Sequence, residues 1–295
     1  MNEVERDEHA GSPDTLLRVR GPGPFVTEWL VEEPSGEHRV RESRRNRKGL
    51  DAEPEQEATR AAPQRALPME PRSFSWWIAV LFMVGSALFA LASAVDLSRP
   101  HAGAYCAATY FVGSLFFSSA AYLQLGEVIN ERDPVTKRYP AFAWWRFQPR
   151  KLAWWACLIQ FCGTLLFNRN TFEGMRTLNP VEEDVLVWAP DAVGSLCFLV
   201  ASYMAFAEVC HRWFRLLPGN ISWWVVFINL LGSVAFGLSA VGSYVAAGGH
   251  MLSPFESSLW TLVGAVCFLV GAYLMLSEMA ARYASPTSPT AQRKR

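Results

Sequence analysis

Hydrophobic residues are gathered into six long runs, separated by polar and charged stretches, at about residues 74–95, 104–126, 152–168, 185–207, 223–247 and 258–277. Most runs reach the roughly 20 residues that an α-helix needs to cross a hydrocarbon core of about 30 Å. Helices are expected because every backbone N–H and C=O in lipid needs a partner within its own segment. The pattern therefore predicts an all-α membrane protein with six transmembrane helices.

The basic residues of the connections are distributed unevenly. Loop 127–151 carries six Lys or Arg residues, loop 208–222 carries two, and the tail 280–295 carries four. The connections after the first, third and fifth runs carry one, two and no Lys or Arg residues, respectively. Because cytoplasmic loops are enriched in Lys and Arg, both termini are expected on the cytoplasmic side. The protein is accordingly predicted to be multi-pass, with the cell membrane as its expected location and the lipid bilayer as its first partner.

A second pattern repeats three times. The first, third and fifth runs each contain Trp-Trp, seven residues, Gly, then Ser or Thr, two residues and Phe, beginning at Trp76-Trp77, Trp154-Trp155 and Trp223-Trp224. The even runs share Gly, then Ser or Ala, two residues, Phe, four residues, Tyr, four residues and Glu, ending at Glu127, Glu208 and Glu278. Repetition at fixed spacing is typical of duplicated units. We therefore predict three tandem helical hairpins, 74–128, 152–209 and 223–279.

The repeated positions suggest packing and anchoring roles. Small residues allow helices to approach closely in lipid, which makes helix packing the expected role of Gly85, Gly113, Gly163, Gly194, Gly232 and Gly264. Gln160 and Asn229 fall on the same stripe as the glycines of their helices and are candidate binding residues, since amides in lipid seek partners on neighbouring helices. The six Trp residues of the pairs are expected to be interface anchors.

Glu127, Glu208 and Glu278 are the remaining candidate binding residues. A carboxylate near a helix C-terminus meets the negative end of the helix dipole, so some interaction should offset that cost. Two interpretations stay open. Hydrogen bonds or ion pairs to nearby Arg or Trp groups could fix each hairpin to the next, or the three carboxylates could form a ring at the cytoplasmic mouth of a cation or proton path.

Residues 1–72 lack sustained periodicity and are predicted to be a mostly disordered cytoplasmic region. Residues 25–41 could form a small β-hairpin, because a β-prone stretch is followed by a turn sequence. The basic cluster Arg44–Lys48 is expected either to be solvated or to contact anionic lipid headgroups. The tail 280–295 is also predicted to be disordered and cytoplasmic.

The polar stretch 168–173 is the main departure from the threefold pattern. Its counterparts in the first and third hairpins are far less polar. A polar loop after a short helix would explain it, and a gate or ligand contact specific to the second hairpin is the alternative.

At these motifs the chain resembles the YrhK-like domain, a small two-helix membrane unit. The resemblance rests on the Gly-Ser-x-x-Phe stretches and on Ile228-Asn-Leu-Leu-Gly-Ser-Val-Ala-Phe236, and it covers about residues 74–279. It implies a multi-span membrane protein and carries no activity with it. The first hairpin departs from the pattern, with Phe82 at the position of the amide.

The chemistry of the chain argues against an enzyme. The five His residues all lie outside the hydrophobic runs, away from their Ser and Cys residues, and no Cys/His spacing of a metal site occurs. No cofactor and no nucleic-acid partner is expected. A membrane scaffold or accessory protein, with membrane-protein partners or self-association, is the favoured function. A small-ion or small-solute channel or transporter with a cytoplasmic Glu ring is the alternative.

Overall fold

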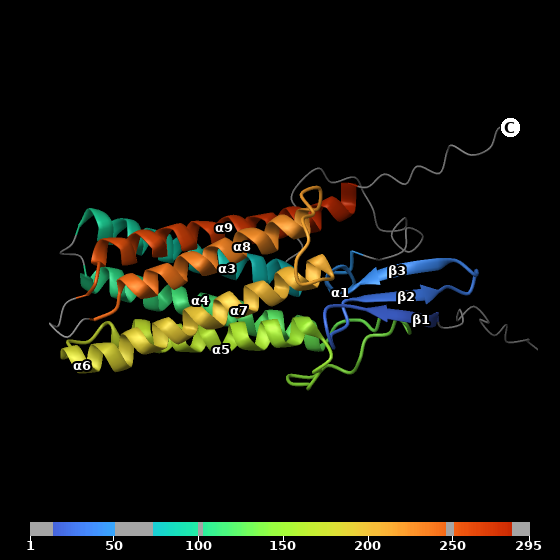
Figure 1. Cartoon of the computed structure of the whole chain (residues 1–295), viewed down its shortest axis with the longest axis horizontal. Helices are drawn as coiled ribbons and strands as arrows, with labels where there is room; N and C mark the ends of the chain where they lie inside the picture. The colour runs from blue at the N-terminus through green and yellow to red at the C-terminus, as the bar shows by residue number, and fades with distance from the viewer. Residues whose placement is uncertain (1–13, 51–72, 100–102, 246–250, 285–295) are drawn as a thin grey trace, which may run out of the picture.

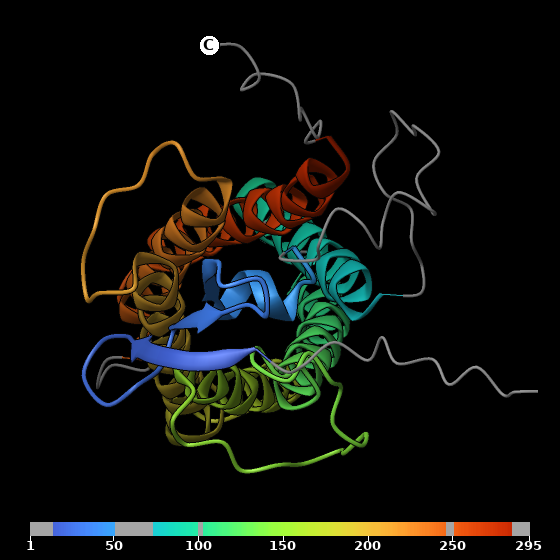
Figure 2. The same ribbon diagram turned by 90° about the vertical axis from the view of Figure 1, so that its right-hand side faces the viewer.

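The computed structural model describes residues 14–50, 73–99, 103–245 and 251–284, and it is mostly helical. Six long helices run side by side (Figure 1). Their bounds are α3 Phe74–Ser98, α4 Gly103–Ile129, α5 Leu152–Glu173, α7 Ala189–Cys210, α8 Ile221–Gly242 and α9 Pro254–Ala284. Each helix packs against the next in the sequence, and α9 packs against α3. The bundle is therefore a closed ring of six helices, as the view along its axis shows (Figure 2).

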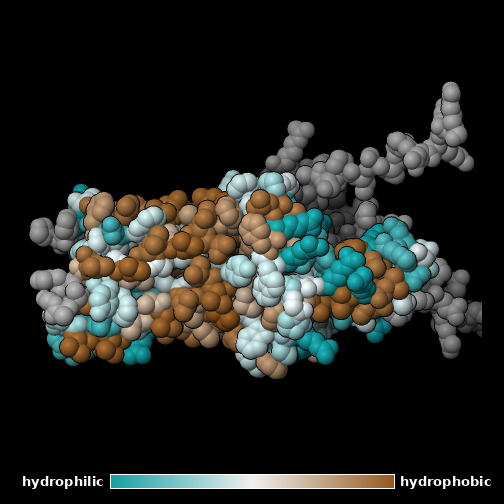
Figure 3. All heavy atoms as spheres, viewed as in Figure 1, coloured by the Kyte–Doolittle hydropathy of each residue, from teal (hydrophilic) through white to brown (hydrophobic). Residues whose placement is uncertain are grey.

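Five helical segments are long and apolar enough to cross a membrane: Phe74–Ser98, Gly103–Ile129, Pro180–Cys210, Ile221–Gly242 and Pro254–Ala280. Helix α5 has a similar length but is less apolar, because its last six residues include Asn168, Arg169, Asn170 and Glu173. The visible outer surface of the bundle is largely hydrophobic, whereas its ends are polar (Figure 3). These features indicate a membrane protein. The sixth span and the side of the membrane on which each end lies stay predictions from the sequence.

A small folded unit covers one end of the bundle, which we call the capped end (Figure 1). Strands β1 Thr15–Arg20, β2 Glu28–Glu32 and β3 His38–Glu42 form an antiparallel sheet in sequence order. The short helix α1 Ser43–Arg47 follows β3 directly and lies inside the circle of helix ends (Figure 2). We call the opposite end of the bundle the open end. There a short helix α6 Pro180–Glu183 and a π-helical turn η1 Asp184–Trp188 lead into α7.

This unit corrects the expectation that residues 1–72 are mostly disordered. Residues 14–50 are folded, and the predicted hairpin 25–41 corresponds to β2 and β3. The sheet forms because Trp29 and Val31, which are two residues apart on β2 and so share one face, are both buried. Strand β1 was not predicted, since all six of its residues are exposed. Residues 1–13 and 51–72 lie outside the described part, as do 285–295, whereas 280–284 extend α9 rather than beginning a disordered tail.

The repeated glycines lie where the two helices of each hairpin cross. A Cβ atom on Gly85 would lie 3.0 Å from the carbonyl oxygen of Gly113. The corresponding distance is 3.2 Å from Gly163 to Gly194 and 3.1 Å from Gly232 to Gly264. A larger residue at these positions would push the neighbouring helix away, so the glycines allow the two helices of each pair to pack closely.

The repeated phenylalanines fill the middle of the ring. All six are buried, and their neighbouring ring centroids lie between 5.0 and 6.5 Å apart. They come from all six long helices: Phe89, Phe117, Phe167, Phe198, Phe236 and Phe268. This aromatic layer closes the axis between the two ends of the bundle.

Candidate functional site

The three repeated glutamates meet at the capped end. They lie in the last turns of α4, α7 and α9. Glu208 and Glu278 are each only 2% exposed, and the Glu127 side chain is 9% exposed. A fourth buried carboxylate, Glu131, follows the end of α4. Four buried carboxylates so close together would strongly disfavour the folded state if they were left without cations. We call this group the acidic mouth.

Helix α1 supplies the cations. Arg44 makes a two-pronged contact with Glu278, with Nε and Nη2 each 2.9 Å from a different carboxylate oxygen. Lys48 Nζ donates to Oε2 of the same carboxylate at 2.7 Å, and the hydroxyl of Ser222 donates to Oε1. A planar guanidinium matches a carboxylate in this geometry, which makes the contact strong and directional.

Arg47 joins the other three carboxylates. Its Nη1 and Nη2 atoms donate to the two oxygens of Glu208 at 3.1 and 3.2 Å. Its guanidinium also lies 3.8 Å from Glu127 and 3.9 Å from Glu131. The hydroxyl of Ser75 donates to Glu127. One arginine of α1 therefore bridges carboxylates on α4 and α7 and just beyond α4.

Burial and charge act in opposite directions on these groups. Burial lowers the pKa of Arg44 and of Arg47, but the facing carboxylates, Glu278 and Glu208 first among them, outweigh it and leave both pKa values raised. Burial and the nearby charge of Arg44 lower the pKa of Lys48 despite its contact with Glu278. Burial also disfavours the charged form of Glu131 and raises its pKa, although Lys151 forms an ion pair with it. The two arginines are thus the firmly charged cations at the acidic mouth.

The structure therefore joins two features that the sequence analysis treated separately. Glu127, Glu208 and Glu278 were expected to form hydrogen bonds or ion pairs with nearby Arg or Trp groups, or else a ring at the mouth of a cation or proton path. Their observed partners are three residues of the Arg44–Lys48 cluster, whose charges face the mouth rather than solvent or lipid. We refer to Arg44, Arg47 and Lys48 together as the basic plug.

The tryptophan pairs divide into two kinds. Trp154 and Trp223, the first members of their pairs, are buried, and their indole N–H groups donate to Arg146 O at 2.9 Å and Arg215 O at 3.0 Å. The second members, Trp155 and Trp224, donate to Pro149 O at 3.1 Å and Pro218 O at 2.9 Å, so both members of these pairs hold the preceding loop against the bundle. Trp76 and Trp155 are half-buried, whereas Trp77 and Trp224 are exposed on the outer surface, as interface anchors would be.

The predicted amides lie apart from the acidic mouth. Asn229 packs on Gly271 of α9. A Cβ atom on Gly271 would collide with the side-chain oxygen of Asn229. Gln160 is half-buried on α5. Neither residue contacts the carboxylates through any interaction found among the described residues.

A trio with metal-ligand chemistry lies between the sheet and the end of α7. Glu28, Glu42 and His211 are half-buried, and their ligand atoms all lie within 4.8 Å of one another. His211 Nε2 is 3.7 Å from each carboxylate, and its Nδ1 lies 3.1 Å from the hydroxyl of Thr27. The neighbouring His211 ring lowers the pKa of Glu42. These contacts tie the cap to the end of α7.

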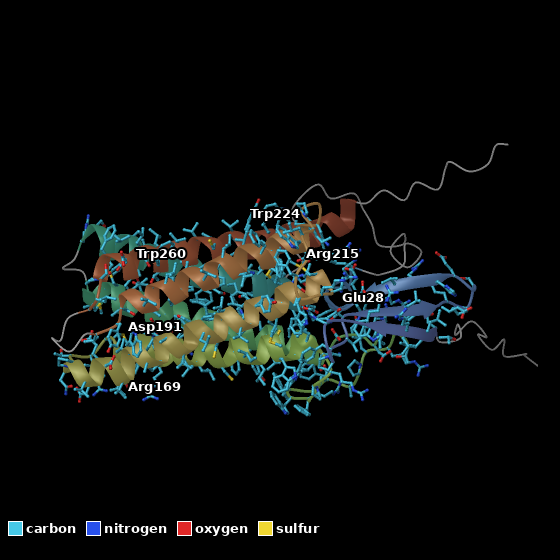
Figure 4. All side chains as sticks on the ribbon, viewed as in Figure 1. Glu28, Arg169, Asp191, Arg215, Trp224 and Trp260 are labelled. Atoms are coloured by element: carbon cyan, nitrogen blue, oxygen red, sulfur yellow. The ribbon has the colours of Figure 1, made fainter. Side chains whose placement is uncertain are left out.

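The open end contains a cavity of about 280 Å³ on the axis of the ring. Residues from all six long helices line it, and the three phenyl rings of Phe89, Phe167 and Phe236 belong to the aromatic layer. Two carboxylates of the long helices line this cavity, Asp96 of α3 and Asp191 of α7, and Glu183 of α6 lines it as well. Figure 4 shows Asp191 in the half of the bundle away from the cap, with Glu28 at the opposite end.

Hydrogen bonds hold both carboxylates in place. The hydroxyl of Ser258 donates to Asp96. Asn170 Nδ2 donates to Asp191 at 3.0 Å, and Ser243 Oγ lies 3.4 Å from its other oxygen. Asn170 belongs to the polar stretch 168–173, for which the sequence analysis left a ligand contact open. Asp96 and Asp191 were missed because each occurs once and neither belongs to the repeated pattern.

No family model, curated protein or solved structure matches this chain. The resemblance to the YrhK-like domain therefore stays a prediction from the motifs, and the function is argued from the site alone.

Proposed function

We propose that this membrane protein is a gated pathway for small cations. The observation that carries the proposal is the position of acidic groups at both ends of one axis, with the aromatic layer between them. Rings of Asp or Glu at a pore mouth attract cations and repel anions, and hydrophobic constrictions can act as gates. In the described structure the pathway is closed, by the phenylalanine rings on its axis and by the basic plug at the acidic mouth.

The basic plug fits the role of a gate because it occupies the place that permeating cations would need. Arg44, Arg47 and Lys48 neutralise the carboxylates that would attract a cation to the mouth. The two arginines belong to the short helix α1 and Lys48 follows it directly, and this segment is connected to the bundle through its ion pairs and the adjoining sheet rather than being part of a long helix. Withdrawal of α1 would expose the four carboxylates together. We place this end in the cytoplasm, as the distribution of basic residues predicts.

Cation flux into proteoliposomes tests the proposal. We expect that replacing Arg44, Arg47 and Lys48 together by Gln raises the flux of a monovalent cation several-fold above that of the unaltered protein, while chloride flux stays at background. Arg45→Gln is the matched control, because Arg45 belongs to the same helix and its side chain donates to the carbonyl oxygen of Leu50. Replacing Glu127, Glu208 and Glu278 by Gln in the plug-free variant should remove the gain.

Two outcomes would argue against a pathway. Flux of cations and chloride rising together would indicate a leaky or unfolded bundle. Background flux in every variant, with the helix content unchanged by circular dichroism, would reject the pathway.

The exposed sheet favours a second candidate, a membrane scaffold. Strand β1 is an edge strand whose Leu16, Leu17 and Val19 are all more than 40% exposed. Exposed edge strands can pair with a strand of another protein. This candidate predicts that Leu17→Pro, which interrupts the edge strand, abolishes capture of a specific membrane partner and leaves cation flux unchanged.

A further inference from the structure

Asp96 and Asp191, two half-buried carboxylates at the open end, differ from the buried acids of the capped end. Asp14, Glu131, Glu208 and Glu278, which are buried at the capped end, each form an ion pair with Lys or Arg. Asp96 and Asp191 form none among the described residues, and no Lys, Arg or His is among the described residues that line the cavity. A carboxylate inside a bundle of apolar helices is costly without a cation. The part of the chain that the structure describes supplies no such cation here, which leaves the cavity open to a bound one.

Asn170 gives an independent sign of a missing ligand. The residue is 6% exposed and lines the cavity, and its Nδ2 atom donates to Asp191. Its Oδ1 atom is buried and has no hydrogen-bond partner. Buried polar atoms are nearly always paired in folded proteins, so an unpaired acceptor beside a cavity indicates a donor that the described residues do not supply. A ligand with N–H or O–H groups, or a water that bridges to it, would satisfy this acceptor.

The rest of the lining indicates the chemical class of the cation. The cavity, at about 280 Å³, is far larger than one dehydrated metal ion. On the side of the aromatic layer it is bounded by Phe89, Phe167 and Phe236, and aromatic faces attract organic cations. The hydroxyls of Tyr110 and Thr261 add polar contacts on the walls. Carboxylates combined with phenyl rings suit an alkylammonium group better than a bare inorganic ion, which prefers a full shell of oxygen ligands.

We propose that the open-end cavity is a binding site for a small organic ammonium ion, held by Asp96 and Asp191 against the phenyl rings. As a statement about the transported substrate, this inference rests on the proposed cation pathway. As a statement about binding, it is tested separately. Binding of an ammonium ion without transport would leave the site in place and remove the pathway.

Calorimetric titration of the full chain in detergent with choline tests the site. Choline is compared with 3,3-dimethyl-1-butanol, its neutral counterpart in which carbon replaces the charged nitrogen, and with sodium chloride. We expect saturable binding of choline and at least tenfold weaker binding of the neutral alcohol. Asp191→Asn and Asp96→Asn should each weaken choline binding by about tenfold or more, because each removes a charge and keeps the side-chain shape.

Two further variants separate the site from general effects on the fold. Glu173→Gln removes a carboxylate at the same end that pairs with Arg176 and does not line the cavity, so choline binding should be unchanged. Phe89→Leu keeps an apolar side chain but removes an aromatic face, and it should weaken choline binding by about threefold or more. The inference is overturned if the alcohol binds as tightly as choline, if both Asn variants bind choline like the unaltered chain, or if only sodium binds.

Discussion

At the residue scale, the closed mouth depends most on Arg47. This side chain is 5% exposed and contacts three carboxylates, so its removal leaves buried negative charge without a partner. We expect Arg47→Met to lower the free energy of unfolding by about 3–5 kcal/mol. Lys48→Met should cost clearly less. The lowered pKa of Lys48 means that the folded protein disfavours its protonated form relative to an ordinary lysine, so losing that charge also removes a desolvation cost.

Equilibrium unfolding in mixed detergent micelles would compare these two variants. Arg45→Met is the control for helix α1, since its side chain is directed to the Leu50 carbonyl oxygen, and it should change the free energy of unfolding little. Equal losses for Arg47→Met and Lys48→Met would contradict the assignment of the arginine as the main partner of the mouth.

Residue patterns predicted the members of the capped-end site but not their pairing. The spacing of the repeat singled out Glu127, Glu208 and Glu278, and charge density singled out the Arg44–Lys48 cluster. The contacts between them join residues 80 to 234 positions apart in the chain. Charge complementarity has no periodicity along a sequence, so only the folded cap could show which groups meet. The open-end site was harder to predict still, because single residues from different helices build it.

At the element scale, the helix crossings allow a sharp comparison between two glycines. A Cβ atom on Gly194 of α7 would lie 2.8 Å from two ring carbons of Phe167, whereas one on Gly237 of α8 would meet nothing within 4 Å. We expect Gly194→Ala to lower the free energy of unfolding by about 1–3 kcal/mol through overpacking. Gly237→Ala should leave stability unchanged or raise it by up to about 1 kcal/mol, because alanine favours the helix. Thermal unfolding in detergent measures the stability of both variants. Equal effects would show that α5 and α7 can move apart at their crossing without loss of stability.

Elements with strong periodicity were predicted well, and the others were not. All six long helices occur where the hydrophobic runs lie, because length and apolar composition determine a membrane helix almost alone. The cap was largely missed. Trp29 and Val31 are the only buried apolar residues of its strands, and α1 is five residues long and is held mainly by ion pairs with distant helices. Short elements of this kind depend on tertiary contacts that no local pattern contains.

At the scale of the whole molecule, α5 decides the topology. It has the length and the ring position of a spanning helix, but its polar last turns keep it from being counted with the five apolar segments. The distribution of basic residues requires α5 to cross, because the connections on its two sides are predicted to lie in different compartments. An even number of spans places both termini on one side, whereas five would separate them.

Two residues that flank α5 can test this directly. Tyr139 lies in the loop before α5 and Val181 lies on α6 after it, and both are 73% exposed, so a cysteine at either position should react equally well with an impermeant maleimide that can reach it. We expect Val181→Cys to be labelled on intact cells and Tyr139→Cys only after the membrane is opened. The unaltered chain, whose six cysteines all lie within the long helices, supplies the background. If both variants are labelled from the same side, α5 does not cross, the acidic mouth and the open-end cavity no longer face opposite compartments, and an axial cation pathway is ruled out.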